Sequence, residues 1–355
     1  MASSNTSLVV RVKAGQPELV KEDLTLPTPG TRQVQVKVSH VAQNPTDVQC
    51  FDVNAFGDGA VLGCDFVGEV TEVGNGVTRL ALGDTVAGLI WGAFDEELGE
   101  TPGLGAYSHY TIADQLISFK VPPSISREDA STVPLAAATA WLALFSKGCL
   151  NIDRSKAQNT SVLIWGGSSS VGLYAIQLAV ICGLRVITTC SPHNADLVRS
   201  FGAKYVFDYN DPKVIEKITE VAPDVQYVFD TIGSTNSSAL SSRAFGDQKG
   251  YLCTVRPGKA NTEHVTAKTH VTDVLVWTAF LKNHSYGTFH WPASKEDHEL
   301  AGELFENLPS WLEQGRVKPN KAKALLGLDS VAQGFQEYRD QKISAYKIVY
   351  KVAQG

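Results

Sequence analysis

Val162-Leu163-Ile164-Trp165-Gly166-Gly167-Ser168-Ser169-Ser170-Val171-Gly172 is the segment from which the architecture of this chain can be inferred. Four apolar residues predict a buried strand, the glycines and serines predict a tight turn, and a helical pattern follows. Glycines let a backbone approach a pyrophosphate closely, and a helix N-terminus adds N–H groups and a positive dipole end. The spacing departs from G-x-G-x-x-G, and a plain structural turn is the alternative. The order strand, turn, helix nevertheless favours a dinucleotide-binding turn.

Strands and helices alternate on both sides of this turn. The predicted strands cover residues 161–165, 185–189, 205–207, 225–230 and 251–255. The predicted helices cover residues 136–145, 171–182, 194–201, 213–221 and 238–245. This rhythm is typical of a doubly wound parallel sheet.

The chain before residue 126 has a different character, with short strands separated by glycine turns. The predicted strands cover residues 8–12, 34–38, 66–73, 83–88 and 107–111, which favours a small β-barrel. An amphipathic helix over about 296–314 leads to a last strand at 347–351. Because a terminal strand needs a sheet to pair with, we expect it to return to the first domain. We therefore predict one domain of residues 1–125 and 291–355, and a dinucleotide-binding domain of residues 126–290.

Composition narrows the function classes. The 355 residues are 43% hydrophobic and 19% charged, as in an ordinary globular protein. A net charge of −6 argues against nucleic acid as a partner, and no apolar run is long enough to span a membrane. The first six residues lack the charged and apolar regions of a secretory signal, so we expect a cytoplasmic protein. Six scattered cysteines, none in a C-x-x-C pair, are expected to be free thiols.

The end of the second predicted strand indicates which nicotinamide cofactor binds. An NAD site places a carboxylate there to bind the ribose 2′-hydroxyl. This chain has Ser191, Pro192, His193 and Asn194 instead. Neutral donors suit a 2′-phosphate, and Tyr209 after the third strand adds a phenol, so we favour NADP(H). The structural alternative is a Ser-Pro turn with Asn194 capping the next helix, and both readings can hold together.

Six motifs together carry a family resemblance over essentially the whole chain. They are residues 44–47 (Asn-Pro-Thr-Asp), 63–68 (Gly-Cys-Asp-Phe-Val-Gly), 165–172, 189–194 (Thr-Cys-Ser-Pro-His-Asn), 207–209 (Phe-Asp-Tyr) and 291–292 (Trp-Pro). The chain resembles the zinc-free medium-chain dehydrogenases/reductases. It is most similar to the trans-acting enoyl reductases of fungal polyketide biosynthesis, of which the lovastatin enoyl reductase is the known example. The resemblance implies a Rossmann domain joined to a GroES-like β-barrel.

The resemblance also implies a set of site residues. The pyrophosphate would lie on Gly166, Ser168, Ser169, Ser170 and Val171, and the 2′-phosphate on Ser191, Pro192, His193, Asn194 and Tyr209. Further cofactor contacts would come from Asp47, Val255 and Ser344, while Thr46, Gln49 and Thr139 would be catalytic. Residues 135–142 and 274–279 would line an acyl channel.

A metal is not expected. Zinc-dependent relatives carry a cysteine where this chain has Asn44 and a histidine where it has Cys64. A tetrahedral site needs three protein ligands besides water, and Cys64 with Asp65 supplies two. The structural four-cysteine lobe would fall within residues 90–115, which contain no cysteine. Hydride transfer without a Lewis acid favours a conjugated substrate such as an enoyl thioester.

One position departs from the family pattern. A lysine often stands two residues after the aspartate of the Asn-Pro-x-Asp motif, and here that residue is Gln49. A lysine can donate a proton, whereas glutamine donates only a hydrogen bond. Gln49 therefore leaves the proton donor open: either it binds the cofactor while water supplies the proton, or the chemistry has drifted.

The resemblance implies reduction, by NADPH, of an α,β-unsaturated polyketide acyl thioester carried by a polyketide synthase acyl carrier domain. Two alternatives stay open: a quinone or enone reductase acting on free small molecules, and a non-redox, cofactor-bound cyclase or scaffold, which only Gln49 supports. We expect a monomer, because related quinone reductases pair through residues 283–289, and here that segment carries His284 and Tyr286 among polar neighbours.

Overall fold

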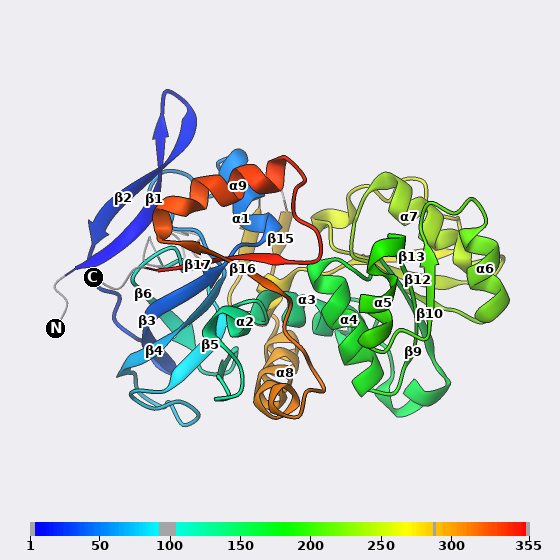
Figure 1. Cartoon of the computed structure of the whole chain (residues 1–355), viewed down its shortest axis with the longest axis horizontal. Coiled ribbons are helices and arrows are strands. Elements are labelled where there is room, and N and C mark those ends of the chain that lie inside the picture. Colours follow the sequence, from blue (N-terminus) through cyan, green and yellow to red (C-terminus); the bar gives the residue numbers. More distant parts are fainter. Residues whose placement is uncertain (1–3, 92–103, 287–288, 353–355) are drawn as a thin grey trace. The chain divides into compact units, whose positions relative to one another are not determined.

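A computed structural model describes residues 4–91, 104–286 and 289–352 of the chain. The chain forms two compact units (Figure 1). Unit 1 comprises Met1–Leu135, Phe305–Gln314 and Pro319–Gly355, and unit 2 comprises Ala136–Leu304 and Gly315–Lys318. The division falls inside two helices, α3 (Pro134–Phe145) and α8 (Lys295–Glu313). The domain limits at 125/126 and 290/291 stay a prediction for the functional domains.

Unit 2 is built on a six-stranded sheet whose order is β10-β9-β8-β11-β12-β13. All neighbours run parallel. The strands are β8 (Ser161–Trp165), β9 (Arg185–Cys190), β10 (Tyr205–Asp208), β11 (Tyr227–Asp230), β12 (Gly250–Thr254) and β13 (Thr269–Asp273). This order confirms the predicted doubly wound sheet, and it reverses between β8 and β11. In such sheets a ligand binds at the carboxyl ends of the strands beside that switch point.

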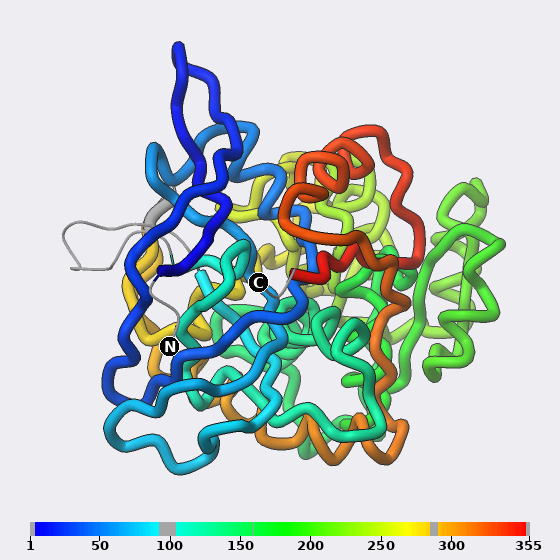
Figure 2. Tube along the Cα trace, turned by 60° about the vertical axis from the view of Figure 1, so that its left-hand side comes forward, coloured from blue at the N-terminus to red at the C-terminus, as the bar shows by residue number. Residues whose placement is uncertain are grey.

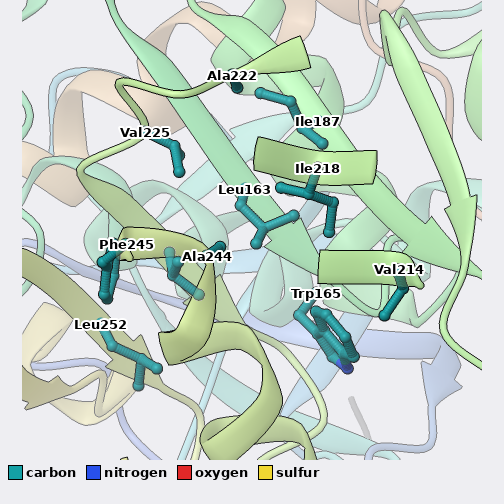
Figure 3. Packing of buried hydrophobic residues seen from close by; sticks show 11 residues of the cluster. Leu163, Trp165, Ile187, Val214, Ile218, Ala222, Val225, Ala244, Phe245 and Leu252 are labelled. Atoms are coloured by element: carbon teal, nitrogen blue, oxygen red, sulfur yellow. The ribbon is translucent and has the colours of Figure 1, made fainter. Parts of the chain in front are cut away.

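Helices cover this sheet. They are α4 (Ser170–Ile181), α5 (Ala195–Ser200), α6 (Val214–Val221) and α7 (Thr235–Ser242). Helix α4 packs against β8 and β9, and α6 packs against β10. Figure 3 shows the core, where Val214 and Ile218 of α6 lie near Leu163 and Trp165 of β8. All five residues of β8 are buried, as expected for a central parallel strand covered on both faces.

Unit 1 holds a seven-stranded, mostly antiparallel sheet around β3. Its strands are β3 (Gln33–Ala42), β4 (Asp65–Val73), β5 (Thr85–Leu89), β6 (Tyr110–Asp114), β7 (Ser118–Lys120), β16 (Ala322–Leu326) and β17 (Lys347–Lys351). A hairpin of β1 (Asn5–Lys13) and β2 (Gln16–Leu24) projects from this unit (Figure 2). Strand β17 pairs with β3, which confirms that the last strand returns to the first part of the chain.

The remaining elements are shorter. Unit 1 also contains α1 (Pro45–Asp52), α2 (Arg127–Ser131) and α9 (Val331–Arg339), and unit 2 contains the hairpin of β14 (His284–Tyr286) and β15 (Phe289–Trp291). Ser126 caps α2 by accepting a hydrogen bond from the Asp129 N–H at 3.0 Å. Across the described residues, we find no helix with the length and apolar character needed to cross a membrane.

Candidate functional site

The turn after β8 has a backbone that only glycine fits. Gly166 has a φ of +84°, in the left-handed region. A Cβ on Gly167 would lie 2.0 Å from the Thr188 hydroxyl oxygen, and one on Gly172 would lie 2.4 Å from the Gly166 carbonyl oxygen. The turn is thus a close-packed cradle, and it leads directly into the N-terminus of α4. The first N–H groups of a helix have no partner within the helix, so the place suits a pyrophosphate.

Hydroxyl groups hold this turn in shape. Ser169 is the N-cap of α4 and accepts a hydrogen bond from the Gly172 N–H at 2.9 Å. The Ser169 hydroxyl donates to Thr231 Oγ1 at 2.8 Å, and Thr231 Oγ1 in turn lies 2.9 Å from the carbonyl oxygens of Trp165 and Gly166. The Ser169 side chain is therefore occupied in shaping the turn. Contacts to a pyrophosphate from Ser169 would come from its backbone.

Sequence reasoning missed Asp230, at the carboxyl end of β11. Its carboxylate is fully buried and accepts hydrogen bonds from the N–H groups of Ile232 and Gly233, both at 3.0 Å. It also accepts hydrogen bonds from the hydroxyls of Ser237 and Ser238, at 2.7 and 2.8 Å. Asp230 thus fixes the loop that carries Thr231. An acid ending a predicted strand and followed by Thr-Ile-Gly-Ser was the available signal.

The proposed 2′-phosphate ligands follow β9 and β10. The Ser191 hydroxyl and the Tyr209 phenol lie 3.3 Å apart, so the structure brings these two predicted donors together. Neither Ser191 nor Asn194 makes a side-chain hydrogen bond that caps the helix after it. Pro192 and His193 are exposed, and Asn194 is half-buried. Asn194 is thus the N-cap residue of α5, as the structural alternative expects, although its side chain makes no capping hydrogen bond.

Two further predicted residues belong to unit 2. Val255 follows β12, is half-buried, and donates its N–H to the Asp230 carbonyl at 3.2 Å. This contact places Val255 at the same edge of the sheet as the loop after β11. Thr139 lies in α3 and is 7% exposed. The Thr139 hydroxyl is therefore largely shielded from bulk water.

In unit 1, Asp47 organises the start of α1. Its carboxylate accepts hydrogen bonds from the N–H groups of Asn44 at 2.8 Å and Gly63 at 3.2 Å. It also accepts hydrogen bonds from the Cys64 thiol at 3.2 Å and the Tyr107 phenol at 3.3 Å. Burial raises the pKa of Asp47 to about 6, against the opposing effect of these donors. Such enclosure favours a positioning role over direct cofactor contact.

A buried ion pair lies beside Asp47. Lys347 Nζ donates to Asp65 Oδ2 at 2.5 Å, and the two side chains are 4% and 0% exposed. The Asn44 amide donates to the same Asp65 oxygen at 2.9 Å, and the Leu135 N–H donates to the other at 2.7 Å. The charge of the Asp65 carboxylate is therefore balanced by Lys347, and both of its oxygens accept hydrogen bonds within unit 1.

The other predicted residues of unit 1 lie on α1 and after α9. Gln49 donates its side-chain N–H to the Tyr338 phenol oxygen at 2.8 Å. The Thr46 hydroxyl lies 3.5 Å from Cys50 Sγ, and Ser344 is exposed in the segment after α9. Sequence reasoning missed Tyr338, because nothing in its local pattern indicates that it meets a residue of α1.

The residues at the place expected for catalytic zinc do not fit that metal. Burial and the neighbouring Asp47 raise the pKa of the Cys64 thiol well above its usual range, whereas zinc binds thiolate. Asp65 is committed to Lys347, and Asn44 offers a neutral amide. Within residues 4–91, 104–286 and 289–352, no three His, Cys, Asp or Glu side chains gather as a metal site would require.

Comparison with known proteins agrees with this picture. Residues 30–123 match a family described as alcohol dehydrogenase GroES-like domain, and residues 170–266 match one described as zinc-binding dehydrogenase. The chain is 34% identical over 345 residues to the trans-enoyl reductase ACTTS2 of Alternaria alternata, covering 96% of this chain and 98% of the relative. It is 32% identical over 349 residues to the trans-enoyl reductase traG of Penicillium crustosum, covering 94% and 93%.

A solved structure shows the same fold. The crystal structure of an alcohol dehydrogenase superfamily protein from Novosphingobium aromaticivorans superposes with a TM-score of 0.76 at 22% identity. The match covers 98% of this chain and 100% of that one. At this identity the likeness concerns architecture: a GroES-like domain together with a Rossmann domain.

Proposed function

Because the chain belongs to the medium-chain dehydrogenase/reductase family, close to the fungal trans-enoyl reductases, we propose that it is itself a trans-acting enoyl reductase. Its reaction would be the NADPH-dependent reduction of an α,β-unsaturated polyketide acyl thioester. The observation that carries this proposal is the likeness, over nearly the whole chain, to fungal proteins of that name. The geometry of the described residues supports it.

The proposal draws on the family's use of a nicotinamide cofactor, which supplies hydride when bound. The cradle of Gly166, Gly167 and Gly172 fits the pyrophosphate, which the backbone of residues 168–171 would hold. The adjacent Ser191 and Tyr209 hydroxyls, with no carboxylate among residues 191–194, support NADPH rather than NADH.

The substrate follows from the donor set. The side chains at the expected catalytic zinc position do not fit zinc, so they would not supply the Lewis acid that a simple alcohol substrate needs. An enoyl thioester needs no such activation, because conjugation already polarises it. Addition of hydride at Cβ places negative charge on the thioester oxygen. Hydrogen-bond donors stabilise such an oxyanion, and we assign this role to the Thr139 hydroxyl together with backbone N–H groups.

The proposal also covers the partner protein, the oligomeric state and the cellular location. A trans-acting reductase receives its acyl chain on the carrier domain of a polyketide synthase, which would be the partner here. We propose that the chain acts as a monomer in the cytoplasm. A carrier-domain pull-down and a sedimentation measurement test the first two points.

The activity test uses NADPH and a set of enoyl thioesters, from crotonyl to longer chains, presented on pantetheine and on a carrier domain. We expect NADPH oxidation with formation of the saturated thioester, faster on the carrier. Tight NADPH binding without thioester reduction would contradict the proposal. Reduction of free quinones or enones alone would select the small-molecule alternative, and product formation without nicotinamide oxidation would select the non-redox alternative.

A further inference from the structure

Arg256 lies at the edge of the unit 2 sheet where the parallel strands end. It comes two residues after β12, and its guanidinium Nε donates to the Gly233 carbonyl oxygen in the loop after β11, at 3.1 Å. Strand β11 lies between β12 and β8, so this bond turns the side chain toward the switch point of the sheet. Ligands of doubly wound sheets bind beside that point, beyond the carboxyl ends of the strands.

The loop that Arg256 reaches also contacts the glycine turn. A Cβ on Gly166 would lie 2.6 Å from Ile232 Cδ1, and the hydroxyls of Thr231 and Ser169 are 2.8 Å apart. Residues 231–233 therefore touch both the proposed pyrophosphate cradle and Arg256. All of these contacts lie within unit 2.

The side chain of Arg256 is held in one place. Gly233 has a φ of +65°, and a Cβ there would lie 2.5 Å from Arg256 Cγ, so only glycine leaves room for the arginine stem. The Asn261 side-chain amide donates to the same Gly233 carbonyl oxygen at 2.8 Å and secures the loop from a second side. Because the stem is packed and Nε is engaged, the two Nη groups form a pre-organised pair of donors.

The positive charge of Arg256 is not balanced by the protein. The side chain is half-buried, and in the part of the chain that the structure describes it forms no ion pair and its Nη groups make no hydrogen bond. The nearby Asp230 carboxylate is occupied by four other donors. Arginines elsewhere in the described chain do pair with carboxylates; they include Arg11, Arg154, Arg185, Arg199 and Arg339.

We propose that Arg256 binds a phosphate group of the ligand held at this edge of the sheet; the proposal rests on the proposed function. A guanidinium offers parallel N–H groups that match two phosphate oxygens. Under the proposed function two ligands carry such a group: the pyrophosphate of NADPH, and the phosphopantetheine arm on which a carrier domain presents its acyl chain. The contact of residues 231–233 with the glycine turn favours the pyrophosphate.

The test measures dissociation constants by calorimetry for the wild type, Arg256→Met and Arg256→Lys. The ligands are NADPH, NADH and, on the NADP⁺ complex, crotonyl-phosphopantetheine and crotonyl-pantetheine. For Arg256→Met we expect NADPH and NADH to bind about tenfold more weakly, because a hydrogen bond between charged groups is lost. The preference for NADPH should stay the same, since both cofactors contain the pyrophosphate. Arg256→Lys keeps the charge and should retain much of the affinity.

The second phosphate source gives a different result. If Arg256 binds the pantetheine phosphate, Arg256→Met should leave both cofactor affinities unchanged. It should then weaken crotonyl-phosphopantetheine about tenfold without affecting crotonyl-pantetheine, which lacks the phosphate. Either pattern supports a phosphate-binding role and identifies the ligand that supplies the phosphate.

Two controls separate charge from loop structure. Asn261→Ala removes a hydrogen bond to the same Gly233 carbonyl oxygen without changing the charge, and should weaken binding much less than Arg256→Met. Arg243→Gln removes the charge of an exposed arginine in the same unit, and should leave all four affinities unchanged. Thermal unfolding midpoints of the variants show whether each is folded.

Three outcomes bear on the proposal from the other side. Wild-type affinities of Arg256→Met for all four ligands would overturn it. An equal loss of affinity in Asn261→Ala and Arg256→Met would also overturn it, because Arg256 would then only hold the loop. A wild type that binds NADPH but reduces no enoyl thioester would overturn the proposed function alone, since the cofactor affinities of Arg256→Met are measured without turnover.

Discussion

Lys347 donates a hydrogen bond to Asp65 at 2.5 Å, and through it the last strand of the chain is joined to β4 by a buried ion pair. The two residues are 282 positions apart in the sequence. A buried charge that loses its partner is costly, even where the intact pair adds little net stability. The stability of unit 1 therefore depends on β17 taking its place beside β3, where Lys347 can reach Asp65.

Replacing Lys347 by methionine should lower the free energy of unfolding by about 3–5 kcal/mol, since Asp65 would be left buried and unpaired. Urea unfolding of the two proteins measures the difference. The matched control is Lys323→Met, whose partner Glu337 forms an ion pair near the surface and whose loss should change stability little. Equal stability of wild type and Lys347→Met would show that the pair is not buried as described.

Because of Asp47, the free energy of unfolding should decrease as the pH rises from about 4 to about 6. Its pKa is raised by burial to about 6, so the folded chain keeps a proton that the unfolded chain has already lost in this window. Above it, the buried charge costs on the order of 2–3 kcal/mol relative to acidic pH. Asp47→Asn removes the titration, so the difference between wild type and variant in unfolding free energy isolates it. A difference that does not change between pH 4 and 7 would contradict the assignment.

Gly172→Ala should abolish NADPH binding or weaken it by at least tenfold. The added Cβ would lie 2.4 Å from the Gly166 carbonyl oxygen, so the cradle would have to open. Gly148→Ala is the control, because its Cβ would meet nothing closer than the Ser146 hydroxyl at 3.7 Å. Fluorescence titration with NADPH compares the two. Unchanged affinity in Gly172→Ala would place the cofactor elsewhere.

Ser191→Ala and Tyr209→Phe should each reduce the preference for NADPH over NADH by about tenfold, since each would remove a hydrogen bond that we propose to the charged 2′-phosphate. The measured quantity is the ratio of the two dissociation constants, which cancels changes common to both cofactors. A ratio that stays constant in both variants would mean that the 2′-phosphate binds other residues.

Much of unit 2 could be predicted from sequence because its signals are local. The apolar run of β8 is followed at once by glycines, and its predicted bounds, residues 161–165, are those of the structure. In unit 1, the predicted bounds of β17, residues 347–351, are likewise those of the structure. A strand that is buried on both faces must be apolar along its whole length. Its apolar run and the turn residues beside it therefore indicate its bounds.

The candidate site in unit 1 could be predicted only in part, because its contacts are long-range. The predicted strand at 107–111 is shifted in the structure to Tyr110–Asp114, since Tyr107 instead points its phenol to Asp47. Neither α1 nor α9 was predicted, and the meeting of Gln49 with Tyr338 follows from packing of these helices rather than from either local pattern. The role of Asp230 likewise depends on where the chain turns after β11.

Calorimetric titration of the purified chain with NADPH and, separately, with NADH determines whether the proposed cofactor site exists. We expect saturable binding of NADPH to one site per chain, at least tenfold tighter than binding of NADH, and loss of that preference in a Ser191→Ala/Tyr209→Phe double variant. No detectable binding of NADPH, or tighter binding of NADH, would contradict it.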